Sequence, residues 1–165
     1  MNVNVQTRTH KIGENLISAI SAGVVFILIG VVFVLAQPSN LWDSIVSFFS
    51  SFTLRLVPGI GISLPAPENP AAHAVLYTAV FQFHIGLGIL QIILLAIRLT
   101  MGSPIGKTAE TMGNLVKWFG GAYLVTTYLN NTTTISRWFM FWAGILIILG
   151  LSLIVRALVL LAKRR

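Results

Sequence analysis

Long stretches of apolar residues without a charged side chain constrain this sequence more than any other feature. No Asp, Glu, Lys or Arg occurs between Glu68 and Arg98. About 20 apolar residues are enough to cross the hydrocarbon core of a bilayer as a helix. The chain is therefore predicted to be an all-α membrane protein. Its most apolar segments predict membrane spans at about 15–37, 74–100 and 136–160.

A fourth span is predicted at about 111–129, although this segment contains Asn114 and Lys117. Lys and Arg concentrate on the cytoplasmic side of membrane proteins. With four spans and the N-terminus inside, nine of the eleven basic residues lie inside, and only Arg55 and Arg137 lie outside. With three spans the basic C-terminal residues 163–165 would lie outside. The charge distribution therefore predicts one transmembrane domain over residues 1–165, with four helices in a bundle and both termini cytoplasmic.

The composition excludes a water-soluble globular domain and a nucleic-acid-binding protein. Charged residues make up 9% of the chain and the mean hydropathy is +0.87, whereas a soluble domain has about 25% charged residues. The net charge of +7 could attract nucleic acid, but the basic residues lie at the ends of apolar runs and form no stripe with aromatic residues. We therefore expect membrane lipid around the chain and no nucleic-acid partner.

The loop between the first two spans predicts a helix of another kind. Over about 41–56, apolar side chains such as Leu41, Ile45 and Phe48 fall on one helical face, and serines fall on the other. This pattern is typical of an amphipathic helix that lies in the membrane interface. A helix packed over the mouth of the bundle has the same pattern. The following segment, 58–70, is rich in Pro and Gly and is too apolar for a solvated loop, so we expect it to pack onto the bundle or a partner.

Polar side chains of the span at 74–100 gather on one face. Tyr77, His84, Gln91 and Arg98 follow one another at intervals of seven residues, which is about two helical turns. A polar group that faces lipid has no hydrogen-bond partner, and its burial is costly. The stripe is therefore expected to face protein or a water-filled cavity.

The span at 111–129 has a comparable face, with Asn114 and Lys117 one turn apart and Glu110 at its start. If the two spans are antiparallel neighbours with facing stripes, His84 lies opposite the Gly120–Gly121 pair and Arg98 lies near Glu110 and Asn114. The candidate site is this intramembrane stripe, with six residues: Tyr77, His84, Gln91, Arg98, Asn114 and Lys117. We interpret His84 and Gln91 first as hydrogen-bonding residues that fix the register of neighbouring helices.

Catalytic and cofactor chemistry finds little support in the sequence. The chain has four carboxylates, none of which shares a span with another, and no cysteine. No hydrolase, zinc-protease or phosphate-binding motif occurs. A haem could be held by His84, but His73 lies on the same face about 16 Å away, so a second chain would have to supply the other ligand. We expect no catalytic residue, no metal and no cofactor.

These features favour a small, non-enzymatic subunit or scaffold of a larger membrane assembly. Its partners would be other membrane protein subunits or further copies of itself. One alternative is a small oligomeric channel or transporter, in which Arg98, Lys117 and Arg156 make a basic inner mouth that favours anions. A further alternative is a membrane anchor that binds haem or quinone through His84.

Overall fold

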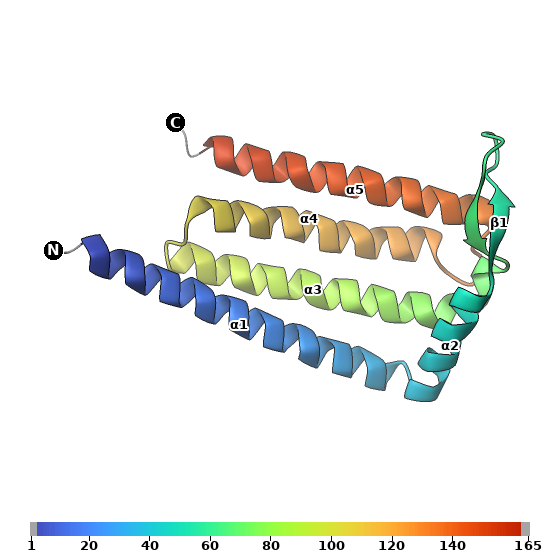
Figure 1. The fold of residues 1–165 in the computed structure, drawn as a ribbon, viewed down its shortest axis with the longest axis horizontal. Helices are drawn as coiled ribbons and strands as arrows, with labels where there is room; N and C mark the ends of the chain where they lie inside the picture. The colour runs from blue at the N-terminus through green and yellow to red at the C-terminus, as the bar shows by residue number, and fades with distance from the viewer. Residues whose placement is uncertain (1–2, 163–165) are drawn as a thin grey trace.

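The computed structural model describes residues 3–162, and the C-terminal basic residues 163–165 that entered the charge count lie outside this range. Five α-helices account for most of the chain, with one β-hairpin and one short 3-10 helix (Figure 1). In chain order the elements are α1 (Val3–Leu35), α2 (Pro38–Ser50), β1 (Phe52–Leu56), β2 (Ser63–Pro67), η1 (Pro70–His73), α3 (Ala74–Thr100), α4 (Ile105–Tyr128) and α5 (Ile135–Ala162).

The four long helices lie side by side as an open layer in the order α1, α3, α4, α5 (Figure 1). The helices of each neighbouring pair pack against each other, and all four run roughly along the long axis of the molecule. In such a layer α3 lies between α1 and α4, and α4 lies between α3 and α5; α2 packs against one end of the layer. The bundle is therefore open, and its inner helices keep exposed surface.

Three helical segments within residues 3–162 are long and apolar enough to cross a membrane: Asn15–Leu35, Pro70–Thr100 and Ile135–Ala162. They correspond to three of the four predicted spans, and α3 has the predicted bounds of 74–100. The fourth predicted span lies in α4, which begins at Ile105 rather than at 111. The mean hydropathy of α4 is lower than that of the three other helices, because α4 contains Lys107, Glu110, Asn114 and Lys117.

The predicted amphipathic helix at 41–56 is correct only in its first part. Helix α2 ends at Ser50, and residues 52–56 form strand β1 instead. Ser51 ends the helix, because its side-chain hydroxyl and its backbone N–H both donate to the carbonyl of Phe48. The next residues then pair antiparallel with β2, from Phe52 opposite Pro67 to Leu56 opposite Ser63. This partner strand comes from the Pro- and Gly-rich segment, so the local helical pattern does not reveal it.

The hairpin is anchored at its base and exposed at its tip. Ala66 and Pro67 are fully buried, whereas Ile60 and Ile62 are mostly exposed. Gly59 and Gly61 have positive φ angles of 82° and 75°, which the connection between the strands requires. The segment 58–70 therefore packs onto the helices only through its second half.

The ends of α3, α4 and α5 nearest α2 meet in an aromatic cluster. Tyr77, Val125 and Trp138 are buried there, one from each of α3, α4 and α5, and Phe48 of α2 packs against them. This cluster joins α2 and the hairpin base to the ends of the long helices, and it fixes one end of the layer. The polar groups that define the candidate site lie between this cluster and the opposite end of the layer.

Candidate functional site: a polar crease along α4

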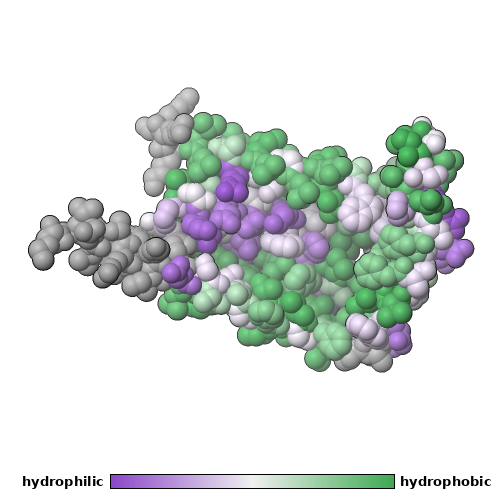
Figure 2. All heavy atoms as spheres, in the orientation of Figure 1, coloured by the Kyte–Doolittle hydropathy of each residue, from purple (hydrophilic) through white to green (hydrophobic). Residues whose placement is uncertain are grey.

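Polar side chains occupy one uncovered face of α4. Glu110, Asn114 and Lys117 are spaced by four and three residues, so they share a face, and all three are partly exposed. Arg156 of α5 is exposed beside them. Figure 2 shows this hydrophilic surface between the hydrophobic surfaces of the neighbouring helices. We call Glu110, Asn114, Lys117 and Arg156 the polar crease.

A close contact between α4 and α5 brings Arg156 to the crease. The hydroxyl of Ser152 donates a hydrogen bond of 2.7 Å to the carbonyl of Gly113. A Cβ atom at position 113 would lie 3.0 Å from the Ser152 carbonyl and 3.5 Å from the Cβ of Arg156. Glycine at 113 is therefore what lets α5 approach this closely, as small residues do between membrane helices.

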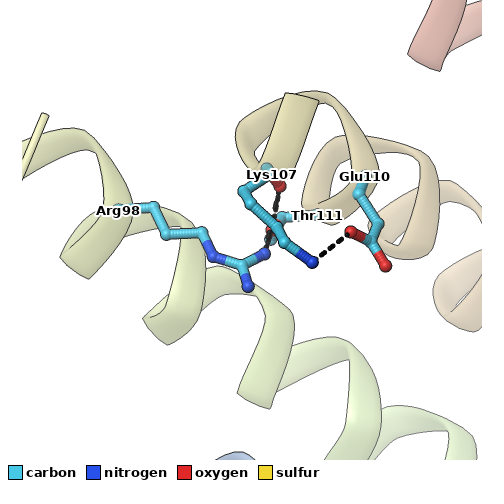
Figure 3. Close-up of polar contacts among 4 residues, drawn as sticks. All are labelled: Arg98, Lys107, Glu110 and Thr111. Atoms are coloured by element: carbon cyan, nitrogen blue, oxygen red, sulfur yellow. Dashed lines mark hydrogen bonds and ion pairs between the residues drawn. The ribbon is translucent and has the colours of Figure 1, made fainter. Parts of the chain in front are cut away.

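Two cations near the start of α4, Lys107 and Arg98, have polar partners on this helix (Figure 3). Lys107 Nζ lies 3.2 Å from Glu110 Oε2, one helical turn away. Arg98 is 8% exposed, and its guanidinium donates to the Lys107 carbonyl at 3.0 Å and to the Thr111 hydroxyl. Arg98 thus joins α3 to the first turn of α4, with contacts at Lys107 and Thr111 in place of the predicted Glu110 and Asn114.

His84 lies where the sequence predicted, against the glycine pair of α4. A Cβ atom at Gly121 would lie 2.5 Å from His84 Cδ2 and 2.8 Å from His84 Nε2, so the imidazole fills the space above this glycine. The neighbouring Gly120 faces Ile148 of α5 instead. His84 Nδ1 lies 2.8 Å from the Val80 carbonyl, and because a carbonyl can only accept, Nδ1 carries the proton.

This geometry makes His84 a packing residue between α3 and α4. Its ring also contacts the Trp118 ring edge-on, with centroids 5.3 Å apart. A haem iron would have to approach Nε2, the nitrogen that lies against Gly121. Among the described residues, no group of three or more His, Asp or Glu side chains could hold a metal ion.

Lys117 has a different environment from the other cations. Its ammonium lies 4.9 Å from the centroid of the Trp118 ring, a cation–π contact. Among the described side chains, no carboxylate lies within ion-pair distance of Lys117. Lys117 is therefore a half-buried charge without a counter-ion in the described part of the chain.

The remaining predicted stripe residues, Gln91 and Tyr77, are both buried. Gln91 lies in α3, and Tyr77 belongs to the aromatic cluster. On α4, Asn114 and Lys117 share a helical face with Gly121. Gly121 faces His84 of α3, whereas the side chains of Asn114 and Lys117 are partly exposed.

The predicted six-residue stripe did not include Arg156, which was named only for the basic mouth of the channel alternative. Its position four residues after Ser152 was a signal that the two share a face. No family model matches the chain, and no curated protein or solved structure shows significant similarity to it.

Proposed function

We propose that this chain is a four-span subunit or scaffold of a larger membrane assembly, without catalytic activity of its own. The polar crease supports the proposal most directly. In a bilayer, polar groups that face lipid lack hydrogen-bond partners and are costly to bury. Asn114 and Lys117 are partly exposed on a face of α4 that the described helices leave open. Another membrane protein, or a further copy of this one, would supply the missing contacts.

The fourth span rests on the position of α4 in the layer. This helix lies between α3 and α5, and it is joined to both by short loops. Its 24 residues give a length of about 36 Å, enough for a hydrocarbon core of about 30 Å. If α3 and α5 cross the bilayer, α4 crosses it between them. Four spans, together with the excess of basic residues at one end, support cytoplasmic N- and C-termini.

Helix α2 is proposed to lie in the outer interface. Its face with Leu41, Ile45 and Phe48 packs against the long helices. A second apolar face is exposed, with Trp42 61% and Phe49 70% accessible. Tryptophan is enriched at membrane interfaces. The two interpretations of the sequence pattern, a helix over the mouth of the bundle and a helix in the interface, are therefore compatible. One side of α2 covers the end of the layer, and the other side is free to contact lipid.

The other two functions have less support from the geometry. An anion-selective inner mouth would need Arg98 to face the conduit, but Arg98 is buried and bonded to α4. A haem anchor would need an accessible ligand nitrogen on His84, but Nδ1 is hydrogen-bonded to the Val80 carbonyl and Nε2 lies against Gly121.

Photocrosslinking from the crease tests the proposed function. The chain has no cysteine, so a benzophenone can be attached at Asn114→Cys, with Ile147→Cys on the exposed apolar face of α5 as the matched control. In native membranes we expect the probe at 114 to form a defined protein adduct and the probe at 147 to react with lipid. Native mass spectrometry would then show an assembly heavier than 18.0 kDa. Lipid adducts alone at both positions would contradict the proposal.

A further inference from the structure

Lys117 lies at the middle of α4, where a charge is hardest to accommodate. The helix runs from Ile105 to Tyr128, and Lys117 follows Lys107 by ten residues, or about 15 Å. This distance is about half the thickness of the hydrocarbon core. Charged residues at such depth usually pair with another group or line a water-filled cavity. The Trp118 ring gives Lys117 one favourable contact, but it leaves the positive charge uncompensated.

The chain pairs no described acidic side chain with Lys117. Its four carboxylates are Glu14, Asp43, Glu68 and Glu110. Only Glu110 belongs to α4, where it pairs with Lys107 and lies seven residues, or about 10 Å, from Lys117 along the axis. A second copy in the same orientation would carry the same residues at the same depths, so it would bring another lysine rather than a carboxylate.

A lipid phosphate is also poorly placed to neutralise Lys117. Phospholipid headgroups lie at the interface, about 15 Å from the membrane centre. A lysine side chain can extend towards the headgroups over only part of that distance. Arg156 and Lys107, which lie nearer the inner end of their helices, are better placed for headgroups.

We propose that Lys117 recognises a transmembrane helix of another protein that carries an Asp or Glu side chain near the middle of the bilayer. The helix would lie in the polar crease, with Asn114 one turn away as a hydrogen-bonding residue. The inference rests on the proposed function, because it assumes that α4 spans the membrane and that protein covers the crease. Beyond the proposed function, the inference specifies that the partner carries a carboxylate within the membrane.

Defined peptides in vesicles test this charge recognition without the natural partner. The protein, labelled with an acceptor dye at Ser103→Cys, is reconstituted in phosphatidylcholine vesicles with donor-labelled Leu-Ala transmembrane peptides. One peptide has Asp at its centre, one has Asn there, one has Asp near its end, and one is wholly apolar. Association is measured by energy transfer for the parent protein, Lys117→Met, Lys117→Arg and the matched control Lys107→Met. Circular dichroism checks that each variant keeps its helical content.

The central-Asp peptide is expected to associate about tenfold more tightly than the apolar peptide. This preference should persist in Lys117→Arg and Lys107→Met and disappear in Lys117→Met. An equal preference in Lys117→Met would overturn the inference. Loss of the preference when phosphatidylglycerol is added would also overturn it, because a lipid phosphate would then be the counter-ion.

The two proposals fail in different ways. If all four peptides associate equally, the crease binds helices without selecting a carboxylate, and only the inference is overturned. If the probe at Asn114→Cys reacts with lipid alone in native membranes, the proposed function is contradicted whatever the peptides do.

Discussion

At the scale of single residues, shape complementarity at glycines sets how the helices approach. The His84 ring occupies the space that a side chain at position 121 would need, with Cδ2 2.5 Å from the position of a Cβ there. Because the ring is held by a hydrogen bond to Val80 and by its contact with Trp118, it has little freedom to move away. The two positions are therefore expected to be energetically coupled.

Gly121→Ala is expected to destabilise the protein by about 1–3 kcal/mol, the usual cost of overpacking. In a His84→Ala background the same substitution should cost much less, because the space above position 121 is then empty. Unfolding in detergent, followed by circular dichroism for the four proteins of this cycle, measures the coupling. Additive effects of the two substitutions would show that the imidazole does not pack on Gly121.

Tyr77→Phe provides a contrasting case in the aromatic cluster. Tyr77 is 3% exposed, and its hydroxyl has no hydrogen-bond partner within the described part of the chain. Removing a hydroxyl that makes no hydrogen bond should leave stability unchanged or increase it slightly, within about 0.5 kcal/mol. The same unfolding assay measures this change. A loss above about 1 kcal/mol would mean that the hydroxyl has a partner in the membrane-bound protein.

At the scale of elements, the sequence predicted helices whose residues follow a local periodic pattern. It missed the β-strand, which forms only by pairing with a later segment of the chain. The apolar run gave the bounds of α3, and the seven-residue spacing led to the contact between His84 and Gly121. Hydropathy marks only the apolar part of a helix, so the polar first turns of α4, from Ile105, were not included. The end of α2 was missed because β1 depends on pairing with residues 63–67.

Helical periodicity also made part of the candidate site predictable. Asn114 and Lys117 followed from their place on one helical face. The membership of Arg156 depends on which side of α4 is covered by α5, and the contacts of Gly113 with Ser152 decide this in three dimensions. The sequence pattern placed Arg156 on a face of its helix but gave no way to know which helix that face meets.

Helix α2 offers a direct test of its two apolar faces. A spin label at Phe49, which is 70% exposed, should be accessible to oxygen from lipid, whereas a label at Ser47 on the polar side should be accessible to a water-soluble nickel reagent. A label at Phe48 should be immobile, because this ring packs against Phe52, Tyr77 and Trp138. Equal access of the nickel reagent to 47 and 49 would argue against an interfacial helix.

At the scale of the whole molecule, the two ends of the layer differ in chemistry. The end with α2 and the hairpin is rich in aromatic residues, and an ion pair of 3.6 Å links Arg55 of β1 to Glu68, the residue after β2. The other end carries Lys107 and Arg98. Aromatic residues occur at both interfaces of a bilayer, whereas an excess of Lys and Arg marks the cytoplasmic side.

Cysteine labelling at the two loops that flank α4 tests the orientation and the fourth span together. Because the chain has no cysteine, Ser103→Cys and Asn131→Cys can each be labelled without background. Ser103 lies between α3 and α4, and Asn131 lies between α4 and α5. If α4 crosses the membrane and the basic end is cytoplasmic, a membrane-impermeant maleimide added to intact cells should label position 131 only. Position 103 should react only after the membrane is permeabilised. Labelling of both positions in intact cells would mean that α4 does not cross the membrane, and labelling of 103 alone would mean that the orientation is reversed.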